Sequence, residues 1–187
     1  MKKTLTALLF AGMLSPIAQA ADYDIDVNGA HAFINFKTSH LGYSWLTGRF
    51  NQFDGTFTYD EDKPDASSVK VTIKTASIDS NHAERDKHLR SDDFLNVEAY
   101  PEATFVSTKI TDKGEGNIEV KGNFTLHGTT NEITIDAEKI GEGKDPWGGY
   151  RAGFAGETTI RLADYGMKEI LGPTTVELEL HIEGVRK

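Results

Sequence analysis

Apolar residues occupy every second position along most of this chain, and that period constrains the fold more than any other feature. The segment 69–74 (VKVTIK) and the segment 176–183 (VELELHIE) are typical, with aliphatic residues on one parity and mostly charged residues on the other. Side chains of a β-strand alternate between the two faces of a sheet, so such runs predict strands with one apolar and one polar face.

The same alternation recurs from residue 23 to the end of the chain, and turn-forming residues separate the runs. It predicts about eight long strands and one short leading strand. No internal repeat and no linker interrupts the series, which indicates one domain. The remaining alternating runs cover residues 23–27, 34–36, 53–59, 103–110, 118–126, 133–137 and 152–162.

Strands that are apolar on one face only are typical of an antiparallel sandwich or a closed barrel. The barrel is favoured because the strands are long, glycines lie inside them, and the apolar parity switches near Asn51 and Gln52, which predicts a bulge or bend. We therefore predict an all-β, antiparallel, eight-stranded barrel. The glycines inside the predicted strands are Gly55, Gly122, Gly153 and Gly156.

One segment, at about residues 82–90, is predicted to be a short inserted helix. Asn81 and Glu84 make an approximate capping box, with Asn81 at the N-cap. A helix this short is marginal in water, so it must dock on something larger, and Leu89 and Phe94 are its apolar docking groups. It is either a lid at the barrel mouth or a surface connector with solvated charges.

The first twenty residues are predicted to be a secretory signal peptide. Lys2 and Lys3 precede an apolar run at 5–14, and Ala18-Gln19-Ala20 forms a small-residue cleavage site. The apolar run is too short to span a bilayer. We therefore expect residues 1–20 to be removed and residues 21–187 to fold in the periplasm of a Gram-negative-type cell, without stable membrane insertion.

Charge and cysteine content exclude several classes of function. Removing Lys2 and Lys3 leaves 18 basic against 29 acidic residues, so the net charge of −9 becomes −11. This balance argues against nucleic acid or an anionic membrane surface as the main partner. The chain has no cysteine, which excludes cysteine nucleophiles, thiolate metal sites and thiol redox chemistry.

No catalytic or metal-binding motif is evident in the sequence. The six histidines are scattered without HExxH or comparable ligand spacing, and there is no GxSxG turn and no glycine-rich phosphate loop. The sequence therefore predicts no metal, no cofactor and no enzymatic activity. A metal site assembled from the distant His40, His82 and His127 stays open as an alternative.

Three apolar, glycine-containing segments are candidates for a ligand mouth. His40 follows Ile34 and Phe36 on the inward parity, and the irregular segment 41–46 (LGYSWL) comes directly after it. The loops 145–149 and 165–171 also expose aromatic or aliphatic groups next to glycines. Alternatively, these residues simply cap the core, as apolar loop residues often do.

Several segments together resemble the YceI-like family of exported bacterial proteins, in their order and spacing and over essentially the whole mature chain. This resemblance implies a lipocalin-like barrel that holds a polyisoprenoid or similar amphiphile in a long internal channel, in a family regarded as binding proteins without established catalysis. At 163–166 the chain has Ala-Asp-Tyr-Gly, where the family commonly has Asp-Phe-Gly, so Tyr165 adds a hydroxyl to that end of the channel. The matching segments are 36–42 (FKTSHLG), 48–50 (GRF), 53–55 (FDG), 85–94 (RDKHLRSDDF), 100–105 (YPEATF) with Ser107, and 122–130 (GNFTLHGTT).

We therefore predict a carrier for a long-chain amphiphile: a polyisoprenoid, an isoprenoid quinone precursor or a fatty-acid-like lipid. Phe94 is expected to reach the cavity and Arg85 to meet a polar or phosphorylated headgroup, unless Arg85 and Asp86 only anchor the helix. The alternatives are an enzyme that acts on a lipid or quinone precursor with His40 and the Arg85/Asp86 pair, or a stress-related structural partner protein. The sequence leaves a homodimer open. The predicted ligand-binding residues are Ile34, Phe36, His40, Leu41, Trp45, Phe50, Phe53, Phe57, Arg85, Phe94, Phe105, Phe124, Leu126, Phe154, Tyr165 and Met167.

Overall fold

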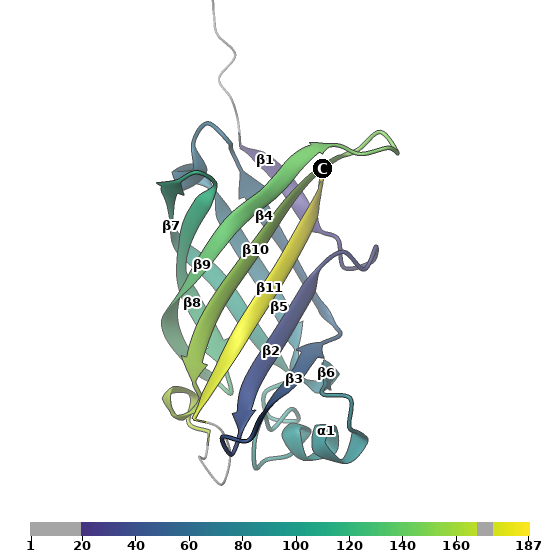
Figure 1. Cartoon of the computed structure of the whole chain (residues 1–187), viewed down its shortest axis with the longest axis vertical. Helices are drawn as coiled ribbons and strands as arrows, with labels where there is room; N and C mark the ends of the chain where they lie inside the picture. Colours follow the sequence, from purple (N-terminus) through teal and green to yellow (C-terminus); the bar gives the residue numbers. More distant parts are fainter. Residues whose placement is uncertain (1–19, 168–173) are drawn as a thin grey trace, which may run out of the picture.

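Within residues 20–167 and 174–187, which are the residues that the structure describes, the computed structural model consists mostly of antiparallel strands (Figure 1). The predicted signal peptide, up to residue 19, lies outside these residues. The strands are β1 (Ala21–Ile25), β2 (Phe33–His40), β3 (Ser44–Phe50), β4 (Phe53–Tyr59), β5 (Ser68–Lys74), β6 (Ile78–Asp79), β7 (Glu102–Gly114), β8 (Asn117–Leu126), β9 (Thr129–Lys144), β10 (Tyr150–Arg161) and β11 (Thr175–Arg186). The helices are α1 (Ala83–Arg90) and the 3-10 turns η1 (Pro64–Ala66), η2 (Thr75–Ser77) and η3 (Leu162–Tyr165).

The sheet closes because the short strand β1 pairs on both sides. Tyr23 of β1 lies opposite Phe57 of β4 and also opposite Arg186 of β11. The closed ring runs β1-β4-β5-β7-β8-β9-β10-β11, while β2 continues along the lower part of β11 and carries β3 and β6 on its outer side. The predicted eight-stranded antiparallel barrel is confirmed.

Aromatic side chains from opposite walls meet inside the barrel. The ring of Phe57 stacks on that of Tyr23, with centroids 4.7 Å apart and planes 9° from parallel. The edge of Phe154, from β10, meets the same Phe57 ring at 5.6 Å. Such pairs contribute about 0.5–1.5 kcal/mol beyond the burial of their apolar area, so strand closure and core packing depend on the same residues.

Two strand glycines allow aromatic rings to lie flat against the barrel wall. A Cβ atom on Gly122 would lie 2.4 Å from Cζ of Phe105, and one on Gly184 would lie 2.3 Å from Cε1 of Phe57. Gly122 lies on the strand next to that of Phe105, and Gly184 is separated from the strand of Phe57 by β1 alone, so a larger residue at either position collides with the ring. Glycine at these positions is therefore a packing requirement of the core.

The chain bends where the sequence changes parity. β3 ends at Phe50 and β4 begins at Phe53, and the two residues between them bond to the end of β5 and to the segment that follows it. The Asn51 N–H donates to the Ser77 carbonyl at 3.1 Å, and the Gln52 N–H donates to Ser77 Oγ at 3.0 Å. The predicted bend at Asn51 and Gln52 is thus present.

Helix α1 lies at the lower end of the barrel (Figure 1), and the predicted N-cap is wrong by one residue. His82 is the N-cap, and its Nδ1 accepts a hydrogen bond from the Arg85 N–H at 3.2 Å. Asn81 has a φ of +60° and forms the left-handed turn that leads into the helix. Asparagine tolerates this conformation better than most residues, which explains why it occupies the turn and not the cap.

We expect Gly122→Ala to destabilise the protein by about 1–3 kcal/mol, because the new methyl group must displace the Phe105 ring. Gly141→Ala is the matched control, since no heavy atom lies within 4 Å of a Cβ placed there. That control should be neutral or stabilise by about 0.5–1 kcal/mol through lower unfolded-state entropy. Urea denaturation of both variants measures the difference, and equal effects would contradict the packing argument.

Candidate ligand-binding cavity

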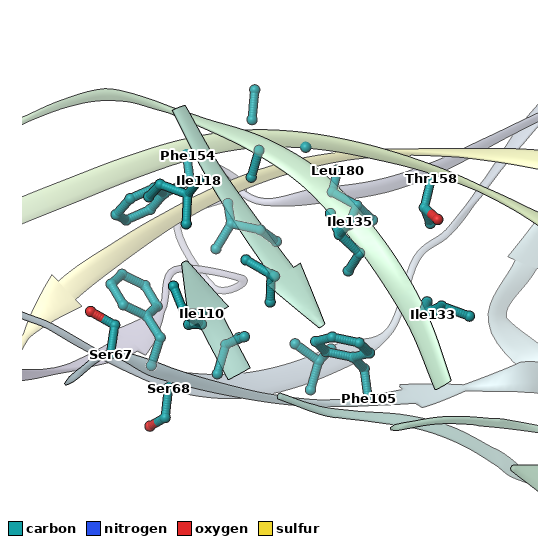
Figure 2. A pocket seen from close by; sticks show the side chains of 18 of the residues that line it. Ser67, Ser68, Phe105, Ile110, Ile118, Ile133, Ile135, Phe154, Thr158 and Leu180 are labelled. Atoms are coloured by element: carbon teal, nitrogen blue, oxygen red, sulfur yellow. The ribbon is translucent and has the colours of Figure 1, made fainter. Parts of the chain in front are cut away.

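A cavity of about 150 Å³ lies inside the barrel. Figure 2 shows that aliphatic and aromatic side chains from several strands point into it, among them Phe105, Ile118, Phe154 and Leu180. The cavity follows the barrel from Ile73, near the lower end of β5, to Tyr59 at the upper end of β4. Its walls suit an apolar guest held by burial rather than by specific polar contacts.

Residues with hydroxyl groups lie near the ends of the cavity, while the surface that faces the cavity is apolar. Ser67 Oγ is buried and has no hydrogen-bond partner among the described residues. Beside it, the hydroxyls of Ser68 and Thr58 are 3.0 Å apart. At the other side, Thr158 Oγ1 donates to the Thr134 carbonyl at 2.7 Å. A guest therefore meets apolar atoms along most of its length.

The structure brings some of the predicted site residues together at the cavity and separates others from it. Trp45 is 59% exposed, and Phe94 packs edge-on against His88 with ring centroids 4.9 Å apart. Of the predicted site residues, those that line the cavity are Ile34, Phe57, Phe105, Phe124 and Phe154. Buried in the core beside it are Phe36, Phe53, Leu126, Tyr165 and Met167, with Phe50 partly buried. His40, Leu41 and Trp45 are exposed at the turn between β2 and β3, and Arg85 and Phe94 lie on or just after α1.

Sequence reasoning missed the aliphatic half of the lining. Ile110, Ile118 and Val120 belong to inward-facing runs that the alternation does identify, but the site prediction favoured aromatic residues. Ala137 and Gly156 also lie in predicted strands, but the pattern did not identify such small residues as ligand contacts. The other lining residues that were missed are Thr58, Tyr59, Ser67, Ser68, Val69, Val71, Ile73, Ile133, Ile135, Ala155, Thr158, Leu178, Leu180 and Ile182.

The predicted mouth loops do not surround a single opening. The turn at residues 41–43 lies at the lower end of the barrel, whereas the loop at 145–149 joins β9 to β10 at the upper end (Figure 1). Trp147, which is 77% exposed, stacks against the guanidinium of Arg151 at 5.5 Å. Of the third loop, residues 168–171 lie outside the described part of the chain. The prediction of a shared mouth is wrong because these hairpins end at opposite ends of the barrel.

Arg85 and Asp86 both bind the segment that precedes the helix. Asp86 is only 7% exposed, and its Oδ1 accepts hydrogen bonds from the backbone N–H and the hydroxyl of Ser80. Arg85 donates from Nε to Ser80 Oγ at 2.7 Å and from Nη2 to the Ser80 carbonyl at 2.6 Å. These are the contacts expected of helix anchors. The headgroup role of Arg85 stays a prediction.

The upper end of the barrel carries an internally paired polar cluster. Lys139 Nζ lies 2.7 Å from a carboxylate oxygen of Glu61 and 3.6 Å from one of Glu142, and it sits 5.3 Å from the ring centroid of Tyr59. Glu142 also accepts a hydrogen bond from the Tyr150 hydroxyl at 3.2 Å. Burial raises the pKa of Tyr59, which keeps its hydroxyl neutral. The charges of this cluster are satisfied by one another.

Asp26, His31 and Glu183 place three candidate ligand atoms within 4.8 Å of one another on the outside of the barrel. Arg151 already forms ion pairs with the two carboxylates of this cluster. Arg151 Nη1 contacts Asp26 at 2.6 Å and Glu183 at 2.5 Å, and its Nε donates to Asp145 at 3.0 Å. A guanidinium with three carboxylates forms a charge-assisted network that ties β10 to the segment after β1. A metal ion there would compete with this arginine, and the prediction of no stoichiometric metal stands untested.

These features define a class of protein: a β-barrel with an apolar interior. No charged side chain is among its described cavity-lining residues. Residues 23–184 match the model of the YceI-like domain, so the chain belongs to the YceI-like family. It is 59% identical over 191 residues to a UPF0312 protein of Shewanella sp. strain ANA-3, and the match covers 100% of both chains.

Solved structures share the fold. The crystal structure of Burkholderia cenocepacia BcnA has a TM-score of 0.78 at 21% identity, covering 86% of this chain and 99% of the other. A polyisoprenoid-binding domain from Saccharophagus degradans has a TM-score of 0.64 at 17% identity, covering 90% and 100%. Within residues 20–167 and 174–187, no helix is long and apolar enough to cross a membrane.

The Asp26 network predicts a pH-dependent contribution to stability. Hydrogen bonds from His31 and Arg151 lower the pKa of Asp26 from 3.8 to about 2. A depressed pKa stabilises the fold above pH 4, and this contribution is lost as the pH falls towards 2. Asp26→Asn should therefore cost about 1 kcal/mol at pH 7 and progressively less below pH 4. Urea denaturation at pH 7, 4 and 2.5 tests this, and a difference that does not change with pH would contradict it.

Arg85→Ala should lower the unfolding free energy by about 1–3 kcal/mol, because it removes two hydrogen bonds from a charged, partly buried group. Lys87→Ala on the exposed side of the same helix is the matched control and should stay within about 0.5 kcal/mol. Thermal denaturation without ligand makes the comparison. Unchanged stability of Arg85→Ala, together with a selective loss of affinity for a phosphorylated prenyl chain, would instead support the headgroup role.

Proposed function

We propose that this protein is a carrier that holds a long-chain amphiphile in the barrel interior: a polyisoprenoid, an isoprenoid quinone precursor or a fatty-acid-like lipid. The observation that carries the proposal is the cavity, which is enclosed by aliphatic and aromatic side chains from seven strands of the closed ring and from β2. A binding surface of this kind gains affinity from apolar area removed from water.

The structural relative from Saccharophagus degradans supports the choice of ligand, because it is a polyisoprenoid-binding domain with the same fold over 90% of this chain. Its sequence is 17% identical, so the likeness concerns the architecture rather than the residues that touch the ligand. The chain length and headgroup of the ligand therefore depend on what this chain's own residues offer.

Energetics fit an apolar chain. Each buried methylene is worth about 0.8 kcal/mol, so a five-carbon isoprene unit contributes at most about 4 kcal/mol. Micromolar affinity needs about 8 kcal/mol in addition to several kcal/mol lost on association, so a few buried units suffice. A dry cavity of 150 Å³ accepts a group about the size of benzene. A longer chain must therefore displace cavity side chains or extend beyond the cavity.

The direct test is mass spectrometry of organic extracts from protein purified under native conditions from its own host. A stoichiometric prenyl or acyl species supports the carrier function. An extract without lipid, from protein that also fails to bind added polyprenol or fatty acid, would overturn it. Chemical conversion of the bound species by the purified protein would move the function to the enzyme class.

Filling the cavity should weaken binding. Ala137 faces inward on β9 and lines the cavity, while the next residue, Glu138, faces outward. We expect Ala137→Leu to lower the affinity for a fluorescent acyl or prenyl probe by about tenfold or more, since its added carbons take the space of ligand carbons. Glu138→Leu is the control and should change the affinity less than twofold. Equal effects would place the ligand outside the cavity.

We also propose that the protein is exported and that the mature chain begins at Ala21, because residues 1–20 have the pattern of a signal peptide. N-terminal sequencing of protein from an osmotic-shock fraction of the native host should start at Ala-Asp-Tyr. Recovery of a chain that begins at Met1 in the membrane fraction would contradict this expectation.

A further inference from the structure

The barrel wall contains a seam where two neighbouring strands stop pairing before they end. The ladder between β9 and β10 ends at the pair Asp136–Glu157. Both strands continue below it, since β9 pairs with β8 down to Thr129 and β10 pairs with β11 down to Arg161. Figure 1 shows these strands side by side across the front of the barrel. We call residues 129–135 of β9 and 158–161 of β10 the seam.

Side chains take over where the backbone ladder stops. Thr158 Oγ1 donates to the Thr134 carbonyl at 2.7 Å, and Asn131 Nδ2 donates to the Asp164 carbonyl at 2.8 Å. Side-chain bonds of this kind can be exchanged by rotation about one or two side-chain torsions, whereas opening a ladder breaks several backbone bonds together. The seam is therefore a part of the described wall that can open at low cost.

The seam connects the internal cavity to an outer groove of about 750 Å³. Ile133, Thr158 and Leu178 line both spaces. All three are only partly buried, whereas the inward-facing residues Ile118 and Val120 on the neighbouring strand β8 are buried. The apolar chain of a ligand that enters between β9 and β10 thus passes directly from the groove to the cavity.

A buried hydroxyl without a partner marks the inner side of the groove. Tyr165 is 1% exposed and lines the groove, and its ring packs edge-on against the cavity residue Phe124 at 5.6 Å. Its hydroxyl makes no hydrogen bond of good geometry among the described residues. The Asn131 amide is near enough to oppose part of the rise in the Tyr165 pKa, but it donates to the Asp164 carbonyl at 2.8 Å. Burial raises the pKa of Tyr165, so the group is a neutral O–H that can donate and accept. A buried polar group left unpaired costs about 1–3 kcal/mol, which a ligand can recover by binding it.

The groove is acidic. Its side chains include six carboxylates and two basic groups. Lys37 lies 2.6 Å from Glu177, and Arg161 lies 3.8 Å from Asp164, so both bases already face a carboxylate. The remaining acids of the groove are Glu132, Asp136, Glu157 and Glu179. A field of this sign repels phosphate and favours a neutral or cationic group.

We propose that the ligand enters through the seam, that its apolar chain occupies the cavity, and that its headgroup stays in the groove and hydrogen-bonds the Tyr165 hydroxyl. Because the groove is acidic, it favours a headgroup with a hydroxyl or an amine and excludes a phosphorylated headgroup. This inference rests on the proposed carrier function and adds the entrance and the headgroup chemistry. The upper end of the barrel is the competing place for a headgroup, because Ser67 Oγ is also without a partner there.

The headgroup is tested with four probes that share one fifteen-carbon chain: farnesol, farnesylamine, farnesyl phosphate and the hydrocarbon farnesene. We expect farnesol and farnesylamine to bind at least tenfold more tightly than farnesyl phosphate at low ionic strength, with a smaller difference in 0.5 M salt. Tyr165→Phe should weaken farnesol binding about three- to tenfold and leave farnesene unchanged. If the headgroup lay at the upper end of the barrel instead, Ser67→Ala would be the variant that weakens farnesol binding. Because Tyr165→Phe removes an unpaired buried hydroxyl, the variant should be at least as stable as the wild type.

The entrance is tested with cysteine pairs, which are unambiguous because the chain has no cysteine of its own. Thr134→Cys with Thr159→Cys spans the seam, and Lys144→Cys with Tyr150→Cys spans the intact ladder above it, where those two residues are register partners. Each double variant is compared after bridging with a short bismaleimide and after capping with N-ethylmaleimide. Bridging the seam should slow the loading of farnesol at least tenfold, and bridging the ladder should change the rate less than twofold.

Three results would overturn the proposal. They are a loss of farnesol affinity in Ser67→Ala but not in Tyr165→Phe, tighter binding of farnesyl phosphate than of farnesol, and unchanged loading after the seam is bridged. In each case the wild type still binds a probe, so the carrier function stands while the seam assignment fails. Failure of the wild type to bind any of the four probes would overturn both.

Discussion

Pairing of the five-residue strand β1 with both β4 and β11 is the interaction on which the barrel depends. It closes the ring of eight strands, so that neither β4 nor β11 is a free edge along β1, and brings walls that are far apart in sequence to face each other. The same strand supplies Tyr23, whose ring stacks on Phe57, and Phe57 in turn meets Phe154 from the opposite wall. Backbone closure and aromatic packing therefore stabilise each other, and the position of the cavity follows from both.

The two halves of the barrel wall are packed differently. Inward residues of β4, β5, β7 and β8 are mostly buried and include large rings, with Gly122 making room for Phe105. Inward residues of β9, β10 and β11 are mostly aliphatic or small and only partly buried, as at Ala137, Gly156 and Leu178. Tight packing transmits strain, so the first half acts as a rigid wall. The second half, where the ladder ends early, is the wall that can adapt to a guest.

Alternation at period two predicts the strands, and its change of parity predicts the bend at Asn51, because both depend on local side-chain direction. The choice of a barrel over a sandwich also needed the strand length and the glycines inside the strands. The alternation could not separate Phe36 from Phe105, which share the pattern but differ in whether the closed ring turns them to the cavity. That distinction depends on register between distant strands. The prediction that the three loops share one mouth was wrong for a related reason. The end of the barrel at which a hairpin lies depends on the direction of its strands. The prediction of Asn81 as the N-cap was wrong because this residue adopts the left-handed conformation of the turn before the helix.

An empty cavity is costly to a protein of this kind. At about 24 cal/mol per Å³, a 150 Å³ void corresponds to roughly 3–4 kcal/mol of lost packing. Native domains are stable by only about 5–15 kcal/mol, and this chain has no disulfide to offset the loss. The Tyr165 hydroxyl adds the cost of an unpaired buried polar group. Both defects lie on one path, from the seam to the barrel interior, and a single amphiphile with a polar head and an apolar tail removes both. The free energy that these two features cost the protein without ligand therefore adds to the binding free energy when the ligand enters.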